Sequence, residues 1–134
     1  MSALTIVGSV FIFIAALIHL AIFFMESVFF SRPAVWKRFG MTSQESADIV
    51  KPMAFNQGFY NVFLAIGGGI GLVMIGSPAF EQAGFGISLF AASSMVAAAL
   101  VLISSSPSRA RAALVQGMTP LVGILFLVLS IVVG

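Results

Sequence analysis

The sequence contains no cysteine and very few charged residues. Without cysteine the protein has no disulfides, no thiolate metal ligands and no cysteine nucleophile. Charged residues make up 7% of its 134 residues, against roughly 25% in soluble domains, whereas hydrophobic residues make up 60%. A soluble domain of this length cannot bury so much apolar surface. The composition therefore predicts an integral membrane protein.

The sequence also lacks a basic tract and a typical signal peptide. The six Lys and Arg residues are few and flank apolar segments, so the net charge of +2 indicates contacts with membrane lipids rather than with nucleic acid. Met1 to Ala3 contain no Lys or Arg, and the following apolar run continues to about Phe30. That run is too long for the core of a signal peptide, so we expect the first segment to stay in the mature protein.

Four apolar runs are long enough to cross a bilayer, which takes about 20 residues in a helix. They cover about 4–30, 53–75, 85–103 and 113–133. Backbone polar groups in lipid have to be satisfied within the segment, which favours helices. The sequence therefore predicts an all-α fold, a four-transmembrane-helix bundle forming a single integral membrane domain over residues 1–134.

The first connection is long, polar and basic. Thr42 and Glu45 have the spacing of a capping box, which predicts a short interfacial helix from Ser43 to Lys51. Pro52 is expected to mark the bend into the second span. This helix either connects the spans or covers the cytoplasmic side as a lid.

The basic residues predict the orientation in the membrane. All six fall in the first and third connections, and the second connection carries only Glu81. The positive-inside rule then predicts a multi-pass protein of the inner (cytoplasmic) membrane with both termini outside and the basic loops in the cytoplasm.

The first span carries two titratable residues, His19 and Glu26. Seven residues make about two helical turns, so both side chains point the same way. The same stripe continues through small and apolar residues: Thr5, Gly8, Ile12, Ala15 and Ala16. Such a face is expected to pack against other helices rather than face lipid.

The second span opens with a run of amides and a tyrosine. Asn56 with Tyr60, and Gln57 with Asn61, are i,i+4 pairs that predict one polar face. Counting depth from the span ends predicts that Glu26 lies level with Asn56 or Gln57, and His19 with Asn61 or Tyr60. The candidate ligand- or proton-binding residues are therefore His19, Glu26, Asn56, Gln57, Tyr60, Asn61 and Gln116. Alternatively, this cluster only fastens the helices together.

Small residues predict close packing of helices elsewhere. Gly67-x-x-x-Gly71 lets a neighbouring backbone approach the second span. On the third span, core packing explains a stripe formed by Ser88, Ala91, Ala92, Met95, Ala98 and Ala99. The single histidine, with no second histidine and no cysteine, predicts no metal site. No dinucleotide or phosphate-binding motif occurs, so we expect no cofactor.

The sequence resembles a known family. The features that carry the resemblance are His19-x6-Glu26, the run Asn56-Gln57-Gly58-Phe59-Tyr60-Asn61, and Gln116-Gly117 followed by Pro120. They are similar to the bacterial domain-of-unknown-function family 1304, a group of small four-span membrane proteins. The resemblance covers nearly the whole chain. It implies a membrane location and four helices, and it implies no reaction.

Three functions fit these features. The first is transport or binding of a small or lipophilic molecule, with proton coupling through Glu26 and His19. Four short spans enclose little volume, so this function predicts a homo-oligomer. The second is a membrane enzyme acting on a lipophilic substrate by isomerase-like acid–base chemistry. The third is an accessory or structural subunit without a site.

Overall fold

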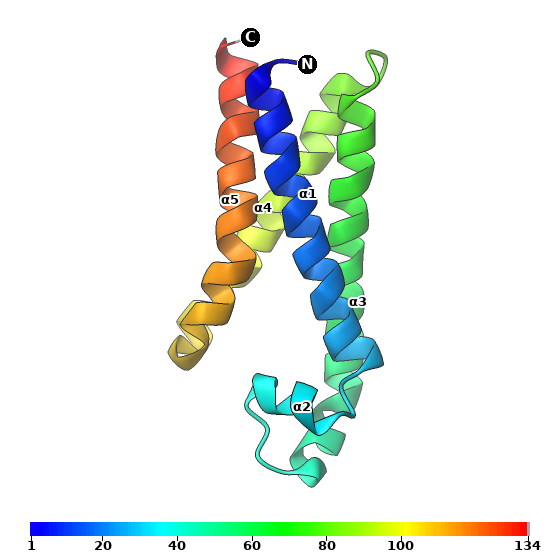
Figure 1. Ribbon diagram of the computed structural model, residues 1–134, viewed down its shortest axis with the longest axis vertical. Coiled ribbons are helices and arrows are strands. Elements are labelled where there is room, and N and C mark those ends of the chain that lie inside the picture. The colour runs from blue at the N-terminus through cyan, green and yellow to red at the C-terminus, as the bar shows by residue number, and fades with distance from the viewer. Residues whose placement is uncertain (134) are drawn as a thin grey trace. The chain divides into compact units, whose positions relative to one another are not determined.

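The computed structural model of the protein, which describes residues 1–133, contains four long apolar helices (Figure 1). They are α1 with its π-helical continuation η1 (Ala3–Phe23 and Phe24–Val28), α3 (Gln44–Ile75), α4 (Glu81–Ser105) and α5 (Ala110–Val133). Each is long and apolar enough to cross a membrane. Residues 1–133 form no strand. The predicted all-α fold with four spans is confirmed, and the protein is a multi-pass membrane protein.

The start of α3 differs from the sequence prediction. The expected short helix over 43–51 and the second span are one continuous helix, and Pro52 lies inside it. The capping box is also shifted by one residue. The Ser46 backbone N–H donates to Ser43 Oγ over 3.1 Å, and the Ser43 backbone N–H lies 3.2 Å from Ser46 Oγ. A serine at the third helical position therefore replaces the expected Glu45 as the reciprocal partner.

The chain divides into two compact units, and the first combines residues 1–18 with residues 64–133. Its core takes one side chain from each long helix: Ile12, Ile75, Ala92 and Leu127. The start of α1 and the end of α5 lie at the same end of this unit, as does the connection between α3 and α4 (Figure 1). Unit 1 is thus an up-and-down arrangement of four helical segments.

Small residues set the helix spacing in unit 1. A Cβ added at Gly71 would lie 2.7 Å from the Ser88 backbone nitrogen, and one added at Gly123 would lie 3.2 Å from the Ile12 nitrogen. The predicted stripe on the third span is buried except for Ala98. The stripe on the first span is buried as well: Thr5, Gly8, Ile12, Ala15 and Ala16. Both stripes therefore face neighbouring helices, as predicted.

The second unit, residues 19–63, has its own small core. Phe30, Trp36, Ala47 and Ala54 are buried together there. The chain reaches this core through the short helices α2 (Pro33–Trp36) and η2 (Lys37–Phe39). Gly40 ends η2 with a φ of 81°, a left-handed conformation that side chains with a Cβ disfavour. Trp36 Nε1 donates to Gln44 Oε1 over 3.3 Å, which ties this segment to the start of α3.

Candidate functional site: the Glu26 carboxylate

Glu26 lies on a π-helical turn that continues the first span. The turn comprises Phe24–Val28, and the Phe29 N–H donates to the Phe24 carbonyl over 2.8 Å. A π-helical turn adds one residue to the helix and shifts the side chains that follow it around the axis. Such turns are rare in proteins, and those that occur are often found at functional sites. The carboxyl group of Glu26 is thus held on irregular backbone at the end of an otherwise regular span.

The partner of Glu26 is the amide of Asn61. Asn61 Nδ2 donates to Glu26 Oε2 over 3.0 Å, and the same nitrogen lies 3.1 Å from the Gln57 carbonyl oxygen one turn earlier on α3. The second contact orients the amide so that its donor group points at the carboxylate. Both Glu26 and Asn61 are half-buried. This carboxylate is therefore bound by an amide.

Gly58 allows the two helices to meet at this point. A Cβ at position 58 would overlap Ser27 Oγ and would lie 3.2 Å from both the Glu26 Cβ and the Phe23 carbonyl oxygen. Ser27 Oγ in turn donates to the Phe55 carbonyl oxygen over 2.8 Å. Close approach at glycine and a side-chain hydrogen bond to backbone are the usual means of joining membrane helices. They fix the distance between Glu26 and Asn61.

The predicted pairing of the polar residues was partly wrong. Asn61, expected to lie level with His19, instead binds Glu26, in place of Asn56 or Gln57. The depth count assumed that α3 begins to pack at the first apolar residue. The helix instead starts at Gln44 and is already buried at Ala47. Asn61, one turn after Gln57, is the residue that meets Glu26, so the register differs from the predicted one by about one turn.

The predicted polar face of the second span covers more of the helix surface than the side of α3 that contacts the first span. At about 100° per residue, Asn61 lies roughly 60° from Gly58 around the helix, whereas Asn56 and Tyr60 lie roughly 160° from it. Asn56, Gln57 and Tyr60 are accordingly exposed. Of the four predicted residues on this helix, the structure brings only Asn61 to Glu26.

His19 and Gln116 complete the predicted set. His19 is buried in α1, on the predicted stripe of small residues. Gln116 is half-buried on α5 and belongs to unit 1. Residues 1–133 hold no group of three His, Cys, Asp or Glu side chains that suits a metal ion.

Two residues of the site were missed at the sequence level. Ser27 on η1 and Gly58 on α3 are in contact, yet neither is titratable and neither entered the polar pattern. Gly58 carries a usable indication, because it is the one small residue within the amide run. A glycine among large side chains on a membrane helix predicts the line of closest approach. The T-shaped pair of Phe23 and Phe59, with ring centroids 5.3 Å apart, packs beside that line.

Comparison with known proteins identifies the family. The profile of the family described as "Protein of unknown function (DUF1304)" matches residues 13–128. The chain belongs to this family. The matched range contains every feature on which the resemblance rested, from His19 to Pro120. No curated protein and no solved structure matches the chain significantly. Membership of DUF1304 therefore confirms the resemblance and assigns no activity.

Proposed function

We propose that this protein binds a small or lipophilic cation at Glu26 within the membrane and carries it across, in exchange for protons. The observation that supports this most directly is the placement of Glu26. It is the only acidic residue within the first span, it lies on a π-helical turn, and its partner is a neutral amide. Ionisable residues within spans are costly and are by default functional.

The depth of the pair suits this role. The 32 residues of α3 make a helix of roughly 48 Å, longer than the roughly 30 Å apolar core of a bilayer. With Ile75 at the outer boundary, the apolar core would end near position 56, and Asn61 would lie roughly 8 Å inside it. A ligand at Glu26 would therefore be drawn from the inner half of the membrane.

The chemistry of the pair favours a cationic ligand. Asn61 binds Oε2 of Glu26, and the proposed ligand binds the other carboxylate oxygen, Oε1. A carboxylate attracts an ammonium or phosphonium group, and protonation abolishes that attraction. Proton binding and cation binding at Glu26 therefore exclude each other, and this exclusion is the basis of exchange. His19, which is buried in α1, stays a candidate for relaying the proton.

We also propose the orientation in the membrane. Four of the basic residues precede α3 or lie near its start: Arg32, Lys37, Arg38 and Lys51. Arg109 directly precedes α5, and Arg111 lies on its first turn. The connection between α3 and α4 has no basic residue. The positive-inside rule places the basic segments in the cytoplasm and both termini outside, in the inner membrane of the cell. Four short spans enclose little volume, so the transport unit is proposed to be a homo-oligomer.

Uptake into proteoliposomes tests the transport function. A pH gradient should drive accumulation of tetraphenylphosphonium, and Glu26→Gln should reduce the rate at least tenfold because the variant cannot bind a proton and a cation in turn. Glu81→Gln is the matched control, since it removes an exposed carboxylate at the start of α4, away from the Glu26 site. Equal rates for Glu26→Gln and the unchanged protein would refute the proposal, as would equal losses in the two variants.

A further inference from the structure

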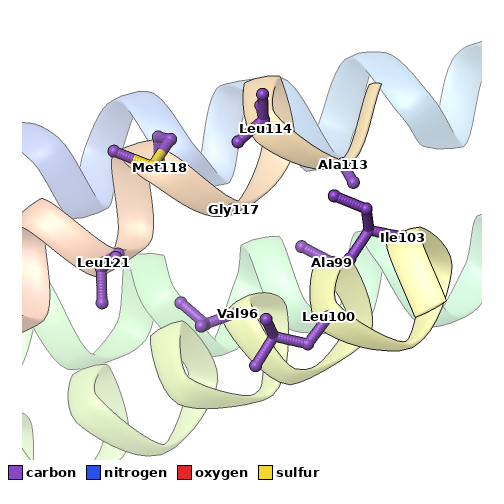
Figure 2. Close-up of a pocket in the computed structure, with 9 residues that line it drawn as sticks. All are labelled: Val96, Ala99, Leu100, Ile103, Ala113, Leu114, Gly117, Met118 and Leu121. Atoms are coloured by element: carbon purple, nitrogen blue, oxygen red, sulfur yellow. The ribbon is translucent and has the colours of Figure 1, made fainter. Parts of the chain in front are cut away.

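An apolar cleft separates the facing sides of α4 and α5 in unit 1 (Figure 2). Its volume is about 110 Å³. It is lined only by apolar residues and glycine, among them Ala99, Leu100, Ala113, Leu114, Gly117 and Met118. None of these belongs to the Glu26 site, so the cleft is a separate feature of the protein.

The cleft has a closed floor and an open edge. Ala99, Ala113 and Gly117 are buried, and a Cβ at Gly117 would lie 2.7 Å from that of Ala99, so the two helices touch there. Leu100 and Leu114 stand at the edge with exposed fractions of 63% and 54%. An α-helix, about 10 Å wide with its side chains, cannot enter so narrow a slot. A chain of methylene groups can.

A basic residue, Arg111, shortly precedes the lining residues of α5 along the helix. Arg111 is exposed on the first turn of α5 and precedes Leu114 and Met118 by three and seven residues. That spacing puts all three on the same side of the helix, with Arg111 nearest the connection between α4 and α5. An apolar slot that leads to a guanidinium group complements a molecule with an acyl chain and an anionic head.

We propose that the cleft between α4 and α5 binds the acyl chain of an anionic phospholipid whose phosphate is held by Arg111. Basic sites between membrane helices at the headgroup level bind anionic lipids in this way. The guanidinium group can form two parallel hydrogen bonds to a phosphate, which an ammonium cannot. The bound lipid would fill the space between α4 and α5 and hold this pair of helices together.

Native mass spectrometry of the detergent-purified protein tests this site with phosphatidylglycerol and phosphatidylcholine as probes. The unchanged protein should retain phosphatidylglycerol in preference. Arg111→Gln should weaken its retention roughly fivefold, and Arg111→Lys should recover part of it. Arg38→Gln is the matched control for charge, since Arg38 is exposed on the short helix η2. Equal losses in Arg111→Gln and Arg38→Gln would refute the proposal.

A second pair of variants tests the apolar part. Leu100→Trp should fill the cleft and reduce retention of both lipids, whereas Val101→Trp, on the next exposed position of α4 outside the lining, should not. Circular dichroism and gel filtration verify that each variant is folded. If Leu100→Trp instead dissociates an oligomer and leaves lipid binding unchanged, the cleft is a contact between copies and the proposal is wrong. It is also wrong if inorganic phosphate displaces the lipid at equal concentration.

Discussion

Gly58 on α3 lies directly against Ser27 on the π-helical turn, so closely that a Cβ at position 58 would overlap the Ser27 hydroxyl. The same added Cβ would lie 3.2 Å from the Cβ of Glu26. The glycine and the carboxylate are therefore parts of one helix crossing, and any side chain at position 58 has to move the group that carries the proposed function.

Replacing this glycine should destabilise the protein. We expect Gly58→Ala to lower the free energy of unfolding by about 1–3 kcal/mol, because the added methyl group forces α1 and α3 apart. Gly69→Ala is the control on the same helix. Nothing lies within 4 Å of a Cβ at position 69, so this variant should be neutral or up to about 1 kcal/mol more stable.

Unfolding in mixed micelles, followed by circular dichroism, gives both values. If Gly58→Ala were as stable as Gly69→Ala, the crossing at Ser27 would be looser than described. Cation binding measured on the same samples should weaken in Gly58→Ala alone, since Gly69 is far along the helix from Asn61.

The hydrogen bond between Asn61 and Glu26 should appear as a coupling energy. In a double-mutant cycle with Glu26→Gln and Asn61→Ala, we expect a coupling of about 0.6–2 kcal/mol, the usual range for polar contacts between membrane helices. The amide of glutamine can still accept a hydrogen bond, so Glu26→Gln alone should cost less stability than Glu26→Leu.

This cycle also separates the two interpretations of the polar cluster. If Glu26 only fastens the helices together, each variant protein should lose function in proportion to its loss of stability. The proposed binding role predicts instead that Glu26→Gln loses cation transport while its unfolding free energy changes little. A large loss of folded protein in Glu26→Gln would favour the fastening role.

The sequence was sufficient for the long helices and for the buried faces of the first and third spans. Each span is a run of about 20 apolar residues, and the lipid environment allows such a run only one regular structure. The stripe from Thr5 to His19 was likewise predictable, because small and polar residues recurring at helical spacing have to face other helices. Both conclusions follow from the sequence of a single helix and do not require its register against a second one.

The partner of Glu26 could not be predicted in the same way. Pairing depends on the register between two helices, and the register is set by the contact of Gly58 with Ser27 and by the hydrogen bond from Ser27 to the Phe55 carbonyl. Counting from the apolar boundaries ignores both contacts. The π-helical turn adds a further shift, and no residue pattern in Phe24–Val28 indicates it.

The Gly67-x-x-x-Gly71 motif should have one sensitive and one tolerant position. A Cβ at Gly71 would overlap Ser88 and come within 3.0 Å of the Gly84 carbonyl oxygen, whereas one at Gly67 would meet the Ala91 Cβ at an ordinary 3.6 Å. We expect Gly71→Ala to cost about 1–3 kcal/mol and Gly67→Ala to be nearly neutral, as measured by the same unfolding assay. Equal costs at both positions would contradict this packing of α3 against α4.

The absence of native cysteine makes the proposed orientation directly testable by single-cysteine labelling. Ala79→Cys places a thiol in the exposed connection between α3 and α4, and Ser31→Cys and Ser108→Cys place thiols in the two basic connections. A membrane-impermeant maleimide added to intact cells should label the first variant and should label the other two only after permeabilisation, because Lys- and Arg-rich segments stay in the cytoplasm. The reverse pattern would invert the orientation and place the Glu26 site in the outer half of the membrane. Labelling of Ser31→Cys and Ser108→Cys from opposite sides would contradict the four crossings themselves, since two spans separate these positions.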